Sequence, residues 1–326
     1  MNTIKFDKVY INDAYTFFGR NEYNPTIISN VDKVINDYYN KEKSLELAEA
    51  SFQRESVKGL LTKLSLSQDE IDLLIGGDLQ NQLLATSFNA KNFNMPLLGV
   101  YSACATFVEG LIIASTLIDG KKINKSIVVS SSHNLASEKQ FRFPIEYGSI
   151  RKKVNTFTAT GSVSALLSSD KGKFKIESAT IGKVIDLNYK DANNFGACMA
   201  PSAAETIYEH LKNTDQNSND YDLILTGDLG VYGVEILKEY LNKKYKIKLN
   251  NIKDAGSVLF DTKVNSKIAG GSGPFCLPLI LFTKIKKNKY KKVLIVGTGS
   301  LHSSISCAQQ ESIPSISHAV SLEVLS

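Results

Sequence analysis

Short apolar runs, each bounded by small or polar residues, recur along the chain and predict buried strands. Residues 71–79 read IDLLIGGDL and residues 221–229 read YDLILTGDL, and seven of the nine positions are identical or conservatively exchanged. An acidic stretch precedes each run, SQDE in the first case and NSND in the second. A repeat with an offset of 150 residues (221 − 71) predicts two α/β units built on the same plan.

Two further pairs of segments appear in the same order in both halves. Residues 124–134 (NKSIVVSSSHN) match residues 290–300 (YKKVLIVGTGS), and residues 161–169 (GSVSALLSS) match residues 318–326 (HAVSLEVLS). Chance matches would not keep their order along the chain. The pairs therefore support an internal duplication.

The apolar strands show little alternation of apolar and polar positions, which is typical of sheets covered on both faces. The predicted fold is a five-layer α-β-α-β-α sandwich in which each half contributes one sheet. We expect the first half over residues 1–172 and the second over residues 173–326. Residues 183–201 carry no strong pattern and predict a long surface connection before a helix that starts near Ser202.

A single cysteine follows the most regular pattern in the chain, MPLLGVYSACATFVEGLIIASTLIDG over residues 95–120. Pro96 opens a strand, a turn follows, and apolar residues at helical spacing then run to Gly120. The alternative is a membrane span over residues 97–118. Glu109 and the glycines in this stretch favour the strand, turn and helix. Cys104 then lies at a helix N-terminus, where the dipole favours a thiolate and the free N–H groups favour an anion. The alternative for Cys104 is a small buried apolar side chain.

Composition adds little to this picture. The chain has 326 residues, a net charge of +5 and 43% hydrophobic residues, as expected for a folded globular protein. Its four cysteines lie far apart, and the first residues carry no signal-peptide pattern, so we expect free thiols in an intracellular compartment. Residues 284–292 hold six lysines, which predict a solvated loop or helix end, with docking to an anionic membrane as the alternative.

The duplicated plan with a strand, an Ala-Cys turn and a helix resembles the thiolase superfamily, including the type III ketoacyl-acyl-carrier-protein synthases. In those enzymes the cysteine at this turn accepts the acyl group. The resemblance implies a thiolase-like sandwich and, because such proteins pair through the edge strands of their first-half sheets, a homodimer.

A second resemblance is more specific. Eight collinear segments are similar to the stage V sporulation protein AD family: GGDLQNQ (76–82), YSAC (101–104), SSHNLASEKQFRFPIEYG (131–148), TGSVSALLS (160–168), CMAPSAAETI (198–207), YDLILTGDLG (221–230), AGGSG (269–273) and QQESIPSISHAV (309–320).

That family implies a protein of endospore-forming bacteria that binds dipicolinic acid, free or as its calcium salt. It further implies a role in dipicolinate uptake during sporulation and release during germination. The implied partners are small integral membrane proteins of the same sporulation operon. The implied location is the developing spore, peripheral on its inner membrane through those partners. We expect no nucleic-acid partner, no cofactor and no resident metal.

The residues that condensing enzymes place around the cysteine are absent at the expected positions. The type III synthases have a His after the first strand of the second half, where residues 226–230 read TGDLG, and an Asn in a later turn, where residues 270–273 read GGSG. A missing donor of this kind costs about 3 kcal/mol of transition-state stabilisation. We therefore expect a non-catalytic site in which Cys104 is a vestigial nucleophile.

A planar dicarboxylate needs hydrogen-bond donors, a cation and an apolar slot. Candidate ligand-binding residues are Cys104, His133, Arg142, Asp228, Ser272 and His318, with hydroxyls of Ser130, Ser131 and Ser132 as additional donors. For Arg142 a structural ion pair is the alternative, for His133 a capping role, and His302 is a further candidate at a strand end. For Asp78 and Asp228, which end equivalent strands, we expect turn capping, with calcium binding as the alternative.

Two other functions remain open on the sequence alone. The first is an acyl-transfer or thioester-cleaving enzyme that keeps Cys104 as nucleophile with His133, His302 or His318 as base. The second is a structural subunit whose pocket holds no ligand.

Overall fold

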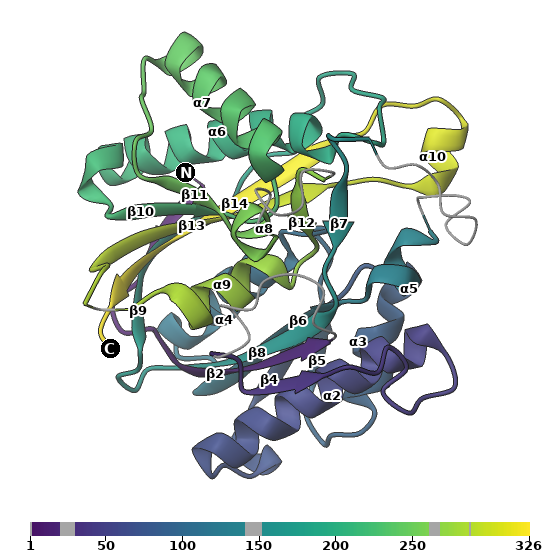
Figure 1. Ribbon diagram of the computed structural model, residues 1–326. Helices are drawn as coiled ribbons and strands as arrows, with labels where there is room; N and C mark the ends of the chain where they lie inside the picture. The colour runs from purple at the N-terminus through teal and green to yellow at the C-terminus, as the bar shows by residue number, and fades with distance from the viewer. Residues whose placement is uncertain (1, 20–29, 141–151, 261–267, 287) are drawn as a thin grey trace.

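The repeated segments form strands β4 and β10, which occupy equivalent places in a symmetric strand order. The computed structural model describes residues 2–19, 30–140, 152–260, 268–286 and 288–326 (Figure 1). Its main strand order is β11-β10-β13-β14-β9-β2-β8-β6-β4-β5, with β1 on β9 and β3 on β2. The strands are β1 (Thr3–Lys5), β2 (Tyr10–Gly19), β3 (Lys33–Ile35), β4 (Leu73–Gly77), β5 (Leu97–Gly99), β6 (Lys125–Ser132), β7 (Thr156–Thr158), β8 (Gly161–Ser168), β9 (Phe174–Thr180), β10 (Leu223–Thr226), β11 (Ile252–Asp254), β12 (Gly270–Ser272), β13 (Lys292–Ser300) and β14 (Ser315–Val324).

Strands β2 and β9 join the two sets of five strands through only two paired positions, at Tyr10 and Ile11. Within each set the pairing repeats: β4 is parallel to β5 and β6, as β10 is parallel to β11 and β13. β8 and β14, the third predicted pair of segments, are antiparallel to β6 and β13. The internal duplication is confirmed, while the boundary between residues 172 and 173 stays a prediction.

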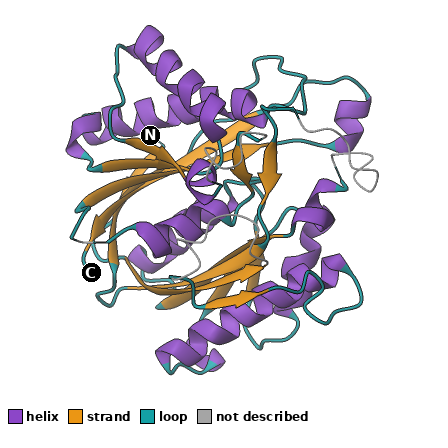
Figure 2. Ribbon diagram, viewed as in Figure 1, coloured by secondary structure: helices purple, strands orange, loops and turns teal. Residues whose placement is uncertain are grey.

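Helices fill three of the five layers, as Figures 1 and 2 show. α2 and α3 cover the outer face of the first-half sheet, α4 and α9 lie between the two sheets, and α6 and α7 cover the second-half sheet. The α-β-α-β-α sandwich predicted from the sequence is confirmed. The helices are α2 (Leu45–Leu64), α3 (Leu84–Ala90), α4 (Thr106–Asp119), α5 (Asn134–Glu138), α6 (Phe195–Thr214), α7 (Gly230–Tyr245), α8 (Ala255–Leu259), α9 (Cys276–Lys284) and α10 (Ser304–Ala308).

The lack of alternation along the strands has a direct cause in the core. On β13, Val293 and Ile295 face the middle layer, whereas Leu294 and Val296 face the outer layer under α6 and α7. All four side chains are completely buried. Full burial of each such side chain contributes about 1.5–3 kcal/mol. Because both faces demand apolar side chains, the strand sequence cannot alternate.

The prediction for residues 183–201 is partly wrong. The helix expected near Ser202 begins at Phe195, so Pro201 lies inside it. Asn194 caps the helix, since its side chain accepts a hydrogen bond from the N–H of Ala197 at 3.2 Å. Pro201 is the seventh residue of the helix, beyond the first turn in which N–H groups lack helical partners, so it removes one N–H from the helical hydrogen-bond pattern.

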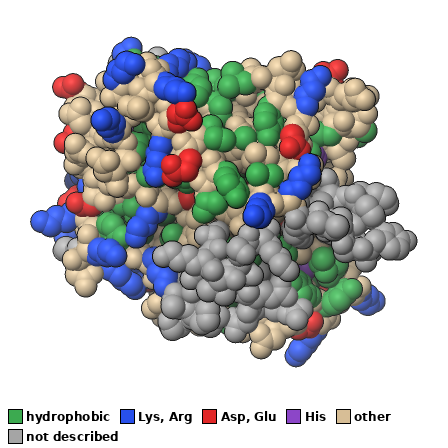
Figure 3. Space-filling view, turned by 45° about the horizontal axis from the view of Figure 1, so that its top comes forward, with side chains coloured by type: hydrophobic (Ala, Val, Ile, Leu, Met, Phe, Trp, Pro, Cys, Tyr) green, Lys and Arg blue, Asp and Glu red, His purple; other side chains and the backbone are tan. Residues whose placement is uncertain are grey.

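Two predictions on the apolar and basic stretches are confirmed. The apolar residues from Leu97 divide into β5, a turn and α4, which ends at Gly120. No helix in the described part of the chain is long and apolar enough to span a membrane. The lysine-rich stretch joins the end of α9 to β13, with Lys286 and Lys291 exposed. Its docking to a membrane stays a prediction. Basic and acidic side chains are interspersed over the face shown in Figure 3.

Candidate functional site

Cys104 stands on a sharp turn between β5 and α4. Ala103 has a φ of 50°, in the left-handed region, which costs a non-glycine residue about 1–2 kcal/mol. Thr106 holds the turn, because its hydroxyl accepts from Ser102 N at 3.0 Å and donates to Ala103 O at 2.7 Å. The turn packs on β13, where a Cβ at Gly299 would lie 2.2 Å from Ser102 O. Backbone strain of this kind, held in place by its surroundings, is typical of functional sites.

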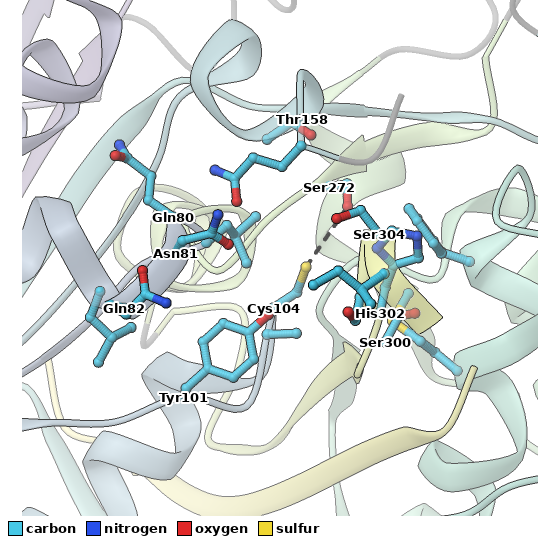
Figure 4. A pocket seen from close by; sticks show the side chains of 18 residues that line it. Gln80, Asn81, Gln82, Tyr101, Cys104, Thr158, Ser272, Ser300, His302 and Ser304 are labelled. Atoms are coloured by element: carbon cyan, nitrogen blue, oxygen red, sulfur yellow. Dashed lines mark hydrogen bonds between the residues drawn. The ribbon is translucent and has the colours of Figure 1, made fainter. Parts of the chain in front are cut away.

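The cysteine faces a cavity of about 420 Å³ between the ends of the two halves. In Figure 4 Cys104 lies between one wall made by Gln80, Asn81 and Gln82 and an opposite wall with Ser272 and His302. Most polar lining groups are neutral amides and hydroxyls. The cavity is lined by Leu79, Gln80, Asn81, Gln82, Leu83, Tyr101, Ala103, Cys104, Gln140, Thr158, Phe195, Met199, Ser272, Ser300, His302, Ser303, Ser304 and Ile305.

Asp228 lies directly behind the wall at Ser272 and is completely buried. Its Oδ2 accepts from the Ser272 hydroxyl at 2.8 Å and from Gly273 N at 3.0 Å. Its Oδ1 accepts from the Thr298 hydroxyl at 2.8 Å. The Cys104 Sγ is 3.9 Å from the Ser272 Oγ. The structure thus brings Cys104, Ser272 and Asp228 together from three separate parts of the chain.

The electrostatics of this cluster keep the thiol protonated. Burial and the negative charge of Asp228 raise the pKa of Cys104 well above its usual value. Burial also raises the pKa of Asp228 to about 6, so this carboxylate is largely ionised at pH 7. The expectation that the helix N-terminus favours a Cys104 thiolate is therefore wrong. Desolvation and a neighbouring carboxylate outweigh the helix dipole, whose effect is typically below 1 kcal/mol.

His133 does not line the cavity. Its Nδ1 accepts from Ala136 N at 3.5 Å as the N-cap of α5, and its Nε2 bonds to Tyr38 O at 2.9 Å. Its ring stacks on Phe52 with centroids 5.8 Å apart. Burial lowers the pKa of His133 to about 4. This is the capping role that the sequence left open as the alternative.

His318 lies behind the turn rather than in the cavity. Its Nδ1 accepts from Gly182 N at 3.1 Å, and its Nε2 is 3.4 Å from the Ser102 hydroxyl, which donates to Glu109 at 2.7 Å. Burial lowers the pKa of His318 to about 4. His302, by contrast, lines the cavity and packs edge-on against Phe195.

The remaining predicted residues divide in two groups. Arg142 lies outside the described residues, two positions after Gln140 of the cavity wall. The hydroxyls of Ser130, Ser131 and Ser132 point into the protein, where they donate to Pro274 O, Glu49 and Ala159 O at 2.7–3.0 Å. Among the described residues that line the cavity, none is a lysine or arginine.

The amide wall at Gln80, Asn81 and Gln82 was missed at the level of the sequence. Gln82 and Leu83 have φ values of 55° and 54°, in the left-handed region, without the glycine that would have marked such a turn. Glu49, which is completely buried, accepts from Gln80 Nε2 at 2.7 Å. Burial and the charge of Asp78 raise the pKa of Glu49 to about 8. The one available signal was the run of three amide side chains directly after a strand.

The described part of the chain offers no set of side chains positioned to bind a metal ion. No group of three or more His, Cys, Asp or Glu side chains there is arranged to hold a metal ion. The Asp78 and Asp228 carboxylates are both fully buried and accept hydrogen bonds from the protein.

Solved structures similar to this chain include condensing enzymes, at low sequence identity. The 3-oxoacyl-[acyl-carrier-protein] synthase III from Aquifex aeolicus VF5 matches with a TM-score of 0.58 and 15% identity, over 97% of this chain and 99% of that one. A variant of Xanthomonas campestris OleA matches with a TM-score of 0.62 and 13% identity, over 99% of this chain and 100% of that one. At these identities the likeness establishes the thiolase-like fold alone.

Sequence comparison is more specific. The family model of stage V sporulation protein AD matches residues 1–323. Stage V sporulation protein AD of Bacillus subtilis (strain 168) is 37% identical over 319 residues, which cover 97% of this chain and 94% of that protein. The chain belongs to the stage V sporulation protein AD family.

Proposed function

We propose that this sporulation protein binds dipicolinate in the cavity at Cys104 without catalysing a reaction on it. The observation that supports this is the cluster of Cys104, Ser272 and Asp228. A condensing enzyme needs a positioned donor for a developing oxyanion. Here Asp228 instead puts a negative charge behind the cysteine, and the thiol stays protonated.

The cavity fits the proposed ligand in size and chemistry. Its volume of about 420 Å³ falls within the range of small-molecule sites. Amide groups of Asn81 and Gln140 and the hydroxyl of Ser304 offer donors for carboxylates, while Phe195 and Met199, with other apolar side chains, offer a surface for the ring. Arg142 remains the proposed cation.

Calorimetric titration with dipicolinate tests the proposal. The wild type should bind saturably, and Asn81→Leu and Arg142→Ala should each weaken binding at least tenfold by removing a donor. Cys307→Ser, a change on α10 outside the cavity lining, serves as the matched control and should bind as the wild type does. The absence of heat at millimolar ligand would exclude this function for the isolated chain.

We further propose that the protein is a homodimer that reaches the spore inner membrane through small membrane proteins of its operon. Among the described strands β5 is the last one of the first-half sheet, and it exposes Leu97 and Leu98 at 37% and 43%, beside Tyr101 at 46%. An exposed apolar edge strand invites pairing with a second copy. Analytical ultracentrifugation of Leu98→Lys against the wild type tests the dimer, and fractionation of spore membranes with and without the operon's membrane proteins tests the location.

Acyl transfer at Cys104 is the second candidate. It is favoured by the continuous path from the Cys104 thiol through the Ser272 hydroxyl to Asp228, along which a proton can leave the sulfur. An acyl-CoA donor would then label Cys104 in the wild type and not in Cys104→Ser. If the wild type is not labelled but still binds dipicolinate, acyl transfer is excluded and binding is the function that stands.

A further inference from the structure

The negative charge of Asp228 is poorly placed for a site that binds an anion. The carboxylate is completely buried and is separated from the cavity by one hydrogen bond, 2.8 Å long, to the Ser272 hydroxyl. Its other partners, Gly273 N–H and the Thr298 hydroxyl, are neutral donors. They stabilise the carboxylate without cancelling its charge.

The titratable groups that the structure describes around Asp228 supply no positive charge, and Arg142, the proposed cation, lies outside the described residues. Burial and then the charge of Asp228 raise the pKa of the Cys276 thiol, as they do for Cys104, so both thiols are neutral. Asp254 is a second buried carboxylate, held by Leu229 N, Gly230 N and the Thr226 hydroxyl. Burial lowers the pKa of His302 on the cavity wall and of His318 behind the turn, which keeps both rings neutral at pH 7.

A ligand carboxylate in this cavity meets a second carboxylate behind the wall, and no described lining residue between them carries a positive charge. The repulsion between two unit charges about 7 Å apart, at the effective dielectric of a protein, lowers the binding constant of the ligand roughly 50-fold. When two carboxylates share a site, one of them takes a proton. Asp228 is prepared for this, because its hydroxyl partners Ser272 and Thr298 can rotate to accept as well as donate.

We infer that the cavity takes up one proton together with an anionic ligand, and that Asp228 holds this proton. The inference rests on the proposed function, since it requires that the ligand be an anion. The proton comes from solvent and is bound to Asp228 as long as the ligand is present. The species bound is therefore the dianion plus a proton, with one negative charge fewer.

The coupling has a definite sign. Burial already raises the pKa of Asp228 to about 6 in the empty site, and the repulsion of a nearby anion raises it further. Affinity should be constant below pH 6 and should fall up to tenfold per pH unit above it. The affinity should level off roughly two pH units higher, where Asp228 is ionised both with and without the ligand.

Calorimetry in calcium-free buffers tests the coupling directly. Dipicolinate is titrated at pH 7 into the wild type in phosphate and in Tris, whose ionisation enthalpies differ, with EDTA present. The observed heats should differ by an amount equal to the uptake of most of one proton. Asp228→Asn should abolish that difference, bind about tenfold more tightly at pH 7.5, and show a flat pH profile.

Asp254→Asn is the matched control, because Asp254 is equally buried but bonds mainly to backbone N–H groups away from Ser272. It should keep the full proton uptake. Burial also raises the pKa of Glu49, behind Gln80 on the opposite wall, to about 8, so the comparison of Asp228→Asn with the wild type is the one that assigns the proton. If Asp228→Asn does not fold, Thr298→Val should shift the pH profile upward instead.

The outcomes separate the two proposals. Binding heats that are equal in both buffers, with a flat pH profile in the wild type, would overturn proton coupling and leave the binding function standing. Uptake that persists in Asp228→Asn would place the proton on another group and overturn the assignment. The absence of any binding heat would overturn the proposed function itself.

Discussion

The two repeated Gly-Asp strand ends have the same sequence pattern, but their aspartates bond to different parts of the protein. Asp78, after β4, bonds within its own turn: it accepts from Gln80 N at 2.8 Å, Thr86 N at 2.8 Å and the Thr86 hydroxyl at 2.6 Å. Asp228, after β10, makes no such local bonds and reaches across to two other strands. The prediction of turn capping agrees with the structure for Asp78 and is wrong for Asp228.

A third acid explains the difference. In the second half Asp254, at the end of β11, accepts from Leu229 N and Gly230 N and so caps the turn that Asp228 leaves. The register places Asp254 beside Thr226, and the equivalent register in the first half places Gly99 beside Gly76. The first half has no acid at that point, so Asp78 must cap its own turn. A duplicated residue becomes available for a site when another residue takes over its structural bonds.

The largest expected effect is on stability, from removal of Asp78. Asp78→Ala leaves two buried backbone N–H groups and one hydroxyl without acceptors, which should lower the free energy of unfolding by about 2–4 kcal/mol. Asp228→Ala should cost less than half as much, because two of its three partners are hydroxyls that can find other acceptors. Urea denaturation of both variants measures the contrast, and equal losses would contradict the division of roles.

A second test concerns Glu49, whose counterpart at the same offset in α6 is Met199 of the cavity wall. Glu49→Met leaves Gln80 Nε2 and the Ser131 hydroxyl without an acceptor and should lower the free energy of unfolding by about 2 kcal/mol. Glu49→Gln should lower it by under about 1 kcal/mol near neutral pH.

The same residue predicts a pH dependence. Burial raises the pKa of Glu49 from 4.5 to about 8, so its protonated form favours the folded state. That contribution is complete below pH 4.5 and is lost as pH rises through 8. The stability of the wild type relative to Glu49→Gln should therefore decline between those values in urea titrations. A constant difference would show that Glu49 is ionised in the folded protein.

A third, smaller effect is on the reactivity of Cys104. Removal of the charge in Asp228→Asn should lower the thiol pKa and raise the rate of alkylation by iodoacetamide at pH 7.5 about tenfold. Thr86→Val, at the first-half acid, serves as the control and should leave the rate unchanged. Mass spectrometry assigns the alkylated cysteine. A slower reaction in Asp228→Asn would indicate that Asp228 activates the thiol, as the acyl-transfer function requires.

The smallest effects come from single hydroxyls. Thr86→Val and Thr298→Val each remove one donor to an aspartate, at 2.6 and 2.8 Å. Each should lower the free energy of unfolding by about 1 kcal/mol at pH 7. Thr298→Val should recover part of that loss near pH 5, where Asp228 is protonated, because the hydroxyl also accepts from Asp228 N at 3.2 Å at either pH. Thermal melts at the two pH values measure both variants, and a recovery of equal size in both would remove the distinction between them.

The sequence was sufficient for the parts of the fold that depend on local pattern. The runs at residues 71–79 and 221–229 became β4 and β10, and the helix after Cys104 ended at Gly120 as its composition indicates. The start of α6 was misplaced because residues 183–201 carry no strong pattern, whereas the helix cap lies at Asn194.

The candidate site was harder to predict for physical reasons. Cys104, Ser272 and Asp228 do meet, but His133 and His318 are held by bonds that depend on distant backbone atoms, Tyr38 O and Gly182 N. The use of Asp254 as a cap depends on strand register, which a single sequence does not reveal.

The cavity also lies at the interface between the two halves. Strand β12 of the second half pairs with β7 of the first, and the register sets Ser272 beside Thr158, both of which line the cavity. A small molecule held between these two residues touches both halves at once. Its binding free energy is then added to the cohesion of the whole molecule rather than to one half. Saturating ligand should make the two halves melt in a single cooperative transition, even in a variant whose halves melt separately when the cavity is empty.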